Sequence, residues 1–234
     1  MEYKSRAISL HYIKYGESSI ITKLFTEKKG LQNFIVKGVR SSRSKKKLSL
    51  FQALELSIIN AKYVPKKNLQ HLTEITFAFP KKQTSVEMQK SFLYLFVAEV
   101  LSKTIKENEI DDALFLFTWN LKIQIQKASK IDANFPLQFL ILLSEHLGFF
   151  PLKESEKKLY FNLESGEFVN KKPLSHFINK KNTCYFKNLL ENRPIKIPYV
   201  NRRQLLLDLL DYYKLQNHEI KNLTSHIIIE SLRS

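Results

Sequence analysis

The sequence predicts an α+β fold in which a small five-stranded barrel, residues 1–80, precedes an α-helical domain, residues 81–234, that carries a small β-hairpin. Two observations support this division. Residues 1–80 contain five short runs rich in β-forming residues, and after Pro80 the apolar residues recur at helical spacing. The chain has 234 residues, of which 44% are hydrophobic, so it is long enough to bury a core in each part.

Five candidate strands are bounded by residues that favour turns. Gly16, Gly30 and Gly38 stand between these runs or at their ends, where a turn needs a positive φ. Apolar and mostly polar residues alternate in the fourth run, as they do in a half-buried strand. Five strands of this length favour an OB-fold barrel, which is the commonest five-stranded choice. The predicted strands cover residues 7–13, 19–26, 31–36, 51–59 and 69–79.

The first helices of the second part are marked by apolar stripes and by capping residues. Residues 84–105 carry a wide apolar stripe at helical spacing. Asp111 and Asp112 are suited to cap a second helix that continues to Ile125. Asn134, followed by Phe and Pro, is typical of a third helix start, and Gly148 stands where that helix is expected to end.

The last third of the chain is expected to contain a hairpin and four helices. Residues 160–169 predict a hairpin that turns at Ser165 and Gly166. Two helices are expected to follow Pro173 and Asn182. The final two are expected at residues 199–215 and 223–232.

The charge of the chain is positive and unevenly distributed. Lys and Arg outnumber Asp and Glu by 38 to 22, which gives a formal net charge of +16. Residues 1–80 hold fifteen basic and five acidic residues. A general bias toward lysine, as in AT-rich genomes, would spread the charge evenly. A positive field favours polyanions, which are DNA, RNA or an acidic membrane surface, and the concentration in the N-terminal third favours nucleic-acid binding over a general lysine bias.

The segment between the third and fourth predicted strands is the strongest candidate for nucleic-acid binding. It is expected to form a loop at one end of the barrel, where cations can bind phosphates without reading bases. The alternative is a solvated turn that only keeps the barrel in solution. Tyr12 and Tyr15 are the candidate rings for base stacking, although most aromatic residues of a small barrel belong to its core. The basic residues of the segment are Lys37, Arg40, Arg43, Lys45, Lys46 and Lys47.

No pattern in the sequence indicates catalysis, a cofactor or a metal. A glycine-rich phosphate loop and a Gly-x-Ser-x-Gly nucleophile elbow are both absent. Cys184 is the single cysteine, and the six histidines lack ligand spacing. No apolar run is long enough to span a membrane, so a cytoplasmic, reducing environment is expected. Arg202 and Arg203 begin a leucine-rich helix and are candidates for a partner site.

Several short motifs, taken together in their order along the chain, resemble the RecO family of bacterial recombination mediators. Each motif alone is loose, but their joint order and spacing are more specific. The motifs are Tyr15-Gly16-Glu17, Leu24-Phe25-Thr26-Glu27, Gly30, Lys37-Gly38-Val39-Arg40, residues 48–56, Leu147-Gly148-Phe149-Phe150-Pro151, residues 203–210 and Tyr212-Tyr213-Lys214-Leu215.

This resemblance implies an OB-fold, a helical domain and a role in DNA repair at the nucleoid. It implies binding of single- and double-stranded DNA, annealing of complementary strands, and loading of RecA together with RecR. It also implies capture of the acidic C-terminal tail of single-stranded-DNA-binding protein, for which Arg202 and Arg203 would be rim cations. Many members carry a four-cysteine zinc module, whereas residues 152–183, which stand in its place, contain no cysteine. Zinc is therefore not expected.

Two other classes of function remain open from the residues alone. The first is an RNA-binding OB-fold protein in translation or RNA processing, because charge does not distinguish RNA from DNA. The second is a DNA-modifying enzyme whose site has no recognisable motif.

Overall fold

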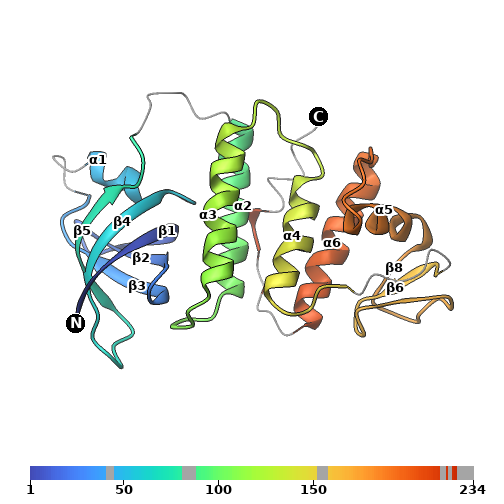
Figure 1. Ribbon diagram of the computed structural model, residues 1–234, viewed down its shortest axis with the longest axis horizontal. Helices are drawn as coiled ribbons and strands as arrows, with labels where there is room; N and C mark the ends of the chain where they lie inside the picture. Colours follow the sequence, from blue (N-terminus) through green and yellow to red (C-terminus); the bar gives the residue numbers. More distant parts are fainter. Residues whose placement is uncertain (41–44, 81–87, 152–157, 217–219, 221–222, 226–234) are drawn as a thin grey trace. The chain divides into compact units, whose positions relative to one another are not determined.

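The computed structural model describes residues 1–40, 45–80, 88–151, 158–216, 220 and 223–225 (Figure 1). The chain divides into two compact units, residues 1–129 and residues 130–234. The predicted α+β class is confirmed: a closed five-stranded barrel comes first, and helices with a small sheet follow. The expected boundary at Pro80 lies beside residues 81–87, which are outside the described residues.

The barrel closes in the order β1-β2-β3-β5-β4. Only the pairing of β3 with β5 is parallel, and all other pairs are antiparallel. Closure gives every strand two hydrogen-bonded neighbours, although β3 and β5 pair only through Phe34–Gln70 and Ile35–His71. The strands are β1 (Glu2–Tyr15), β2 (Ser19–Thr26), β3 (Gly30–Val36), β4 (Leu56–Lys62) and β5 (Gln70–Phe77).

The barrel interior is filled by apolar side chains from alternate strand positions. In β2, for example, Ile20 and Leu24 are completely buried inside, together with Phe34 of β3 and Ile59 of β4. The pairing of β1 with β2 shifts between Ser9 and His11, which marks a β-bulge. A bulge reverses the inside–outside alternation of the strand, so it decides which side chains of the last third of β1 face outward.

Two expectations about the segment between β3 and β4 were wrong. The fourth strand was expected over residues 51–59 but begins at Leu56. The chain instead forms a short 3₁₀ helix, η2 (Ser49–Phe51), and turns at Leu54, which is buried with a φ of 56°. Phe51 is thus buried from the 3₁₀ helix and Leu54 from the turn, whereas a strand would place these two residues, three positions apart, on opposite faces. The basic segment, expected as a loop, ends in the short helix α1 (Lys45–Leu48).

Two helices complete the N-terminal unit and cover part of the outside of the barrel. They are α2 (Met88–Thr104), which packs on β1, and α3 (Asp112–Lys127). The predicted cap of α3 is confirmed, because the Asp111 carboxylate accepts a hydrogen bond from the Leu114 backbone N–H at 2.8 Å. The Phe25 ring of β2 lies edge-on to Phe115 of α3, with centroids 5.4 Å apart.

The C-terminal unit combines three helices with a three-stranded sheet. Helix α4 (Phe135–His146) begins at the predicted Phe-Pro pair, and Gly148 follows it with a φ of 83°. The predicted hairpin is confirmed as β6 (Tyr160–Asn162) and β7 (Glu167–Val169). A third strand, β8 (Phe177–Ile178), gives the order β7-β6-β8. Helices α5 (Lys180–Leu190) and α6 (Tyr199–Leu215) follow.

The helix expected after Pro173 was wrong. The chain there forms part of the sheet, because Phe177 pairs with Asn162 of β6. In addition, the Leu163 backbone N–H donates to the His176 carbonyl at 2.8 Å. A single helix, α5, follows, with Asn179 as its N-cap. The expected helix at residues 223–232 lies largely outside the described residues. Among the described residues, no helix is both long and apolar enough to cross a membrane.

Candidate nucleic-acid interface

One end of the barrel brings the candidate residues Tyr15 and Lys37 close to the start of β2. Strand β1 ends there, β2 begins there and β3 ends there. In β2, Ser19 pairs with Tyr15 of β1, and the next residue, Ile20, pairs with Val36 of β3. Lys37, which follows Val36, therefore lies beside Ser19 on the side away from Tyr15. The Tyr15 side chain is 52% exposed, and Lys37 is also exposed. A ring and a cation therefore stand on either side of one serine at this barrel end.

Arg40 fixes the turn between β1 and β2 at the same end. Its backbone N–H donates to the Ser18 carbonyl at 2.9 Å, and its Nη1 donates to the Gly16 carbonyl at 3.0 Å. The side chain is only partly exposed. Arg40 therefore holds the turn that presents Tyr15, in addition to bringing its own charge to the barrel end.

The other predicted residues have different surroundings. Lys47 is exposed on α1. Lys45 and Lys46 also belong to α1, but their side chains lie outside the described residues, as does the whole of Arg43. Tyr12 is partly buried and packs against the barrel core, so its ring is less accessible to a base than that of Tyr15.

A row of isoleucines on the outside of the barrel adds an apolar component that the sequence analysis missed. Ile13 of β1 pairs with Ile21 of β2, which in turn pairs with Ile35 of β3. Ile13 is 51% exposed, and the other two are partly exposed. We call Ile13, Ile21 and Ile35 the isoleucine row. The β-branched residues were visible in the sequence, but the outward direction of Ile13 depends on the bulge in β1.

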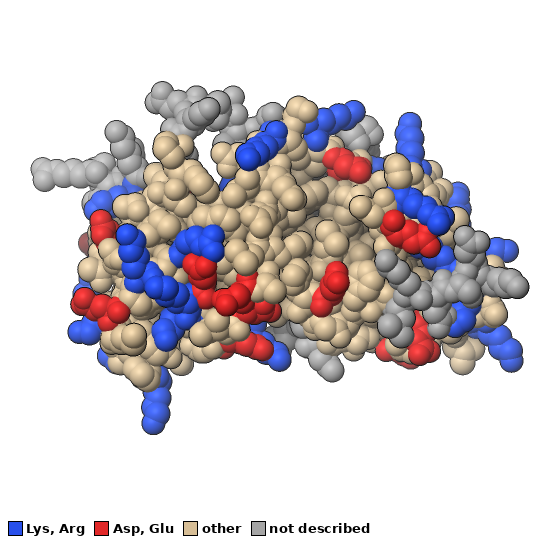
Figure 2. All heavy atoms as spheres, in the orientation of Figure 1, with Lys and Arg blue, Asp and Glu red and all other residues tan. Residues whose placement is uncertain are grey.

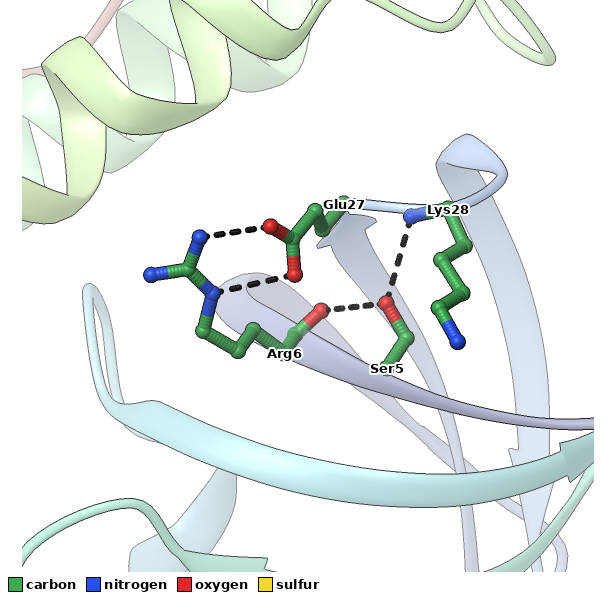
Figure 3. A network of polar contacts seen from close by, with 4 residues as sticks. All are labelled: Ser5, Arg6, Glu27 and Lys28. Carbon is green, nitrogen blue, oxygen red and sulfur yellow. Dashed lines mark hydrogen bonds and ion pairs between the residues drawn. The ribbon is translucent and has the colours of Figure 1, made fainter.

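Arg6, in contrast, is engaged in contacts with other residues of the same unit. Its Nε donates to Glu27 Oε2 at 2.9 Å and its Nη2 donates to Oε1, as Figure 3 shows. The Ser5 hydroxyl donates to the Arg6 carbonyl and accepts from the Lys28 backbone N–H. The guanidinium also lies over the Trp119 ring of α3, 5.1 Å from its centroid. Arg6 therefore attaches α3 to the barrel.

The two charges of this pair stabilise each other. The hydrogen bond from Arg6 lowers the pKa of the Glu27 carboxyl, and the same hydrogen bond raises the pKa of Arg6. Lys23 is likewise engaged, with Glu107 at 3.4 Å. On the face shown in Figure 2, basic side chains over the barrel lie beside acidic ones. Positive charge alone thus does not identify a ligand contact, and Lys37, Lys47 and Tyr15 are the better candidates.

The C-terminal unit contains a cavity of about 560 Å³ beside the first turn of α6. Arg202 lines it, and its Nη1 donates to the Ile197 carbonyl at 3.3 Å. Arg203 is exposed and does not line the cavity. The structure therefore separates the two arginines that the sequence placed together.

The cavity wall is mainly apolar, with polar groups at defined points. Tyr199 lies under the Arg202 guanidinium, and Lys196 adds a second cation. Asn134 is buried; its Nδ2 donates to the Ile195 carbonyl at 2.8 Å, while its Oδ1 has no hydrogen-bond partner among the described residues. A ligand with an apolar side chain and an anionic group would match the apolar wall and the two cations.

The described residues contain no group of three or more His, Cys, Asp and Glu side chains that could hold a metal ion. Cys184, the single cysteine of the chain, is exposed on α5.

Comparison with known proteins gives a consistent result across the chain. Residues 1–80 match the family model described as "Recombination protein O N terminal". The chain is 31% identical over 219 residues to the DNA repair protein RecO of Flavobacterium psychrophilum, covering 91% of both chains. It is 31% identical to that of Flavobacterium johnsoniae, over 221 residues and 91% of both chains. It is 27% identical over 241 residues to that of Phocaeicola vulgatus, covering 100% of both.

Proposed function

The chain belongs to the RecO family of DNA repair proteins, and on this basis we propose that it is a recombination mediator that binds single- and double-stranded DNA and anneals complementary strands. The observation that carries the proposal is the barrel end, where exposed Lys37 and Tyr15 flank Ser19. The relatives are named for DNA repair, which favours DNA over RNA as the ligand.

Annealing by this chain requires only that repulsion between two polyanions be reduced. A protein with a net charge of +16 replaces condensed counterions by fixed cations. Lys37 and Lys47 are placed to bind phosphates, while Tyr15 and the isoleucine row offer an apolar surface to bases. Phosphate contacts leave the pairing edges of the bases accessible. We therefore propose no catalytic residue, no nucleotide hydrolysis and no cofactor.

The test is the annealing rate of complementary oligonucleotides, followed by fluorescence quenching without ATP. The wild-type protein is expected to accelerate annealing over buffer, and the acceleration is expected to fall steeply with salt. The double substitution Lys37→Ala/Lys47→Ala is expected to remove most of it. Lys62→Ala/Lys127→Ala, which removes two exposed lysines elsewhere in the same unit, is the matched control.

Two outcomes would contradict the proposal. Tight binding of single strands at low salt without any gain in annealing rate would remove the mechanism and favour a passive nucleic-acid-binding role. Equal loss in the test and control variants would mean that total charge acts, and not the barrel end.

We further propose that the cavity beside α6 binds the C-terminal tail of single-stranded-DNA-binding protein. An acidic and apolar tail needs an apolar groove with cations at its rim. Arg202 and Lys196 are such cations, and Tyr199 is part of the apolar wall.

Arg203 offers a neighbouring control for this site, because it carries the same charge outside the cavity lining. Binding of a fluorescent tail peptide to the full chain is expected to weaken about tenfold or more in Arg202→Ala, since one partner of a desolvated charge pair is lost. In Arg203→Ala the change is expected to be small. Equal weakening in both variants would place the tail elsewhere.

Cooperation with RecR and loading of RecA complete the proposed role, which would be performed at the nucleoid in the cytoplasm. Both are measurable as RecA filament formation on strands coated with single-stranded-DNA-binding protein, with and without RecR. The Arg202→Ala variant is expected to load RecA more slowly on coated strands, while its activity on naked strands is retained.

A further inference from the structure

The three-stranded sheet of the C-terminal unit has one buried and one open face. Phe161 of β6 and Ile178 of β8 pair with each other and are completely buried. Because successive residues of a strand point to opposite faces, Tyr160 and Phe177 lie on the open face, and both are partly exposed. Val169, which pairs with Tyr160, belongs to the same face. The open face therefore displays two aromatic rings and one aliphatic side chain.

The two rings are held in a defined arrangement. Tyr160 and Phe177 meet edge-to-face, with centroids 5.9 Å apart and ring planes at 80°. They come from neighbouring strands, since β6 pairs with β8. Their direction is set by the burial of Phe161 and Ile178 on the other face, so the rings form a preorganised apolar surface at low entropic cost.

Four lysines with exposed side chains flank this surface in the sequence. Lys171 and Lys172 follow β7, and Lys180 and Lys181 follow β8 in the first turn of α5. Lys172 Nζ lies 5.4 Å from the Phe177 ring centroid. Within the described part of the chain, none of the four has a carboxylate at ion-pair distance. Glu167 of β7 is the acidic residue of the same sheet face.

We propose that the open face of this sheet is a second binding site for single-stranded nucleic acid, separate from the barrel. Bases would stack on Tyr160 and Phe177, and the phosphates would contact the flanking lysines. Aromatic rings on a sheet surface with surrounding cations match a polyanion whose every unit carries a π-face. An acidic peptide would use the charge but would leave the rings without a stacking partner.

The site extends the proposed function, and only its use in annealing depends on that function. A chain with two separate single-strand sites can hold two strands at once, or two parts of one strand. In the first case the local concentration of the two strands rises, which favours pairing without any further chemistry.

The test is photocrosslinking of the full chain to an oligonucleotide of about ten nucleotides that carries 5-iodouracil. Mass spectrometry of the peptides is expected to show crosslinks at Tyr160 or Phe177. Crosslinks at Tyr15 report the barrel independently, so failure of one site does not conceal the other. Crosslinks confined to the N-terminal unit would overturn the second site and leave the proposed function intact.

Variants separate stacking from charge. In Tyr160→Leu/Phe177→Leu, which keeps apolar volume but removes both crosslinking rings, binding is followed by fluorescence anisotropy in the Lys37→Ala/Lys47→Ala background. The oligonucleotide concentration for half-maximal binding is expected to rise roughly tenfold. Lys172→Ala is expected to raise it less but measurably, whereas Lys130→Ala, an exposed lysine of the same unit, is the control. Circular dichroism confirms that each variant is folded.

Competition identifies the ligand. An unlabelled oligonucleotide is expected to displace the probe from the sheet more effectively than an abasic strand of equal charge or polyglutamate. Equal displacement by the abasic strand, or an unchanged double leucine variant, would show that the rings do not stack on bases. Preferred displacement by polyglutamate would assign the face to an acidic protein and overturn the proposal.

Discussion

The barrel of the N-terminal unit and the sheet of the C-terminal unit both pack against helices. Different interactions stabilise the two β-structures. The barrel strands have seven to fourteen residues and form a closed ring of hydrogen bonds. The sheet strands have two or three residues, and β7 and β8 are edges. Short edge strands are not stable by backbone pairing alone. Side-chain packing must therefore supply the stability of the sheet.

That packing is an aromatic cluster centred on Phe161. Its ring centroid lies 4.9 Å from Phe168 of β7, 5.0 Å from Phe186 of α5 and 5.4 Å from Tyr212 of α6. The cluster joins the sheet to both helices. Phe161 and Phe168 of this cluster lie within residues 152–183, where the family resemblance would place a zinc module. Buried rings hold the hairpin in this segment.

The largest expected effect is the loss of this cluster. Phe161→Ala is expected to destabilise the C-terminal unit by about 3–5 kcal/mol, because it removes a fully buried ring and leaves a cavity. Hydrogen exchange is expected to accelerate at the amides of β6–β8 and α5 and to remain unchanged in β1–β3. Phe177→Ala, on the open face, is the control with a smaller cost. Equal acceleration in the barrel would contradict the difference between the two β-structures.

The second prediction concerns pH, because the pKa of Asp208 in the C-terminal unit is raised and the pKa of Glu27 in the N-terminal unit is lowered. Burial between helices raises the pKa of Asp208 to about 6, while Gln204 donates a hydrogen bond to its Oδ1 at 2.8 Å. Folding therefore opposes ionisation of Asp208, and its contribution to stability falls as pH rises from about 4 to about 6. The pKa of Glu27 is lowered, so its contribution is present at neutral pH and is lost on acidification.

Asp208→Asn is therefore expected to be more stable than wild type at pH 7.5, by up to about 3 kcal/mol, with little difference near pH 4. Glu27→Gln is expected to show the opposite trend, with a cost below about 1 kcal/mol because the pair is about one-third exposed. Urea unfolding at both pH values measures these differences. A constant offset between Asp208→Asn and wild type across this range would contradict the assignment.

The third prediction compares the two proposed DNA-binding regions by salt dependence. Lys37→Ala/Lys47→Ala and Lys171→Ala/Lys172→Ala are each expected to flatten the log–log salt slope of single-strand binding by about 0.7 per lost phosphate contact. Combined, the two changes are expected to add, because the sites lie in separate compact units. An unchanged slope in either double variant would identify those lysines as solvated surface charge.

The smallest expected effect is that of metal removal. If aromatic packing holds the sheet, a chelator is expected to leave the melting temperature unchanged, since no folding free energy would come from a metal. Elemental analysis of the purified protein completes the measurement. One tightly bound zinc per chain would contradict the aromatic account of the hairpin.

Features that depend on local chemistry could be predicted from the sequence. Turn glycines at positions 16 and 30, the Asp111 cap, the Phe-Pro start of α4 and the stop at Gly148 were all predicted and are confirmed. Each is a property of a few consecutive residues, because backbone conformation and capping act within one turn.

The contacts that each side chain makes could not be predicted in this way, because they depend on the packing of the whole fold. Residues 177–178 form a strand because they pair with β6. Leu54 is buried because the chain turns at this residue. Ile13 faces outward because of a bulge that is defined by pairing, and Arg6 is occupied because Glu27 and Trp119 lie beside it. Arg202 lines a cavity and Arg203 does not, although they are neighbours. Residues distant in sequence determine which way these side chains point and what they contact. The local pattern of apolar and charged residues does not identify those distant residues.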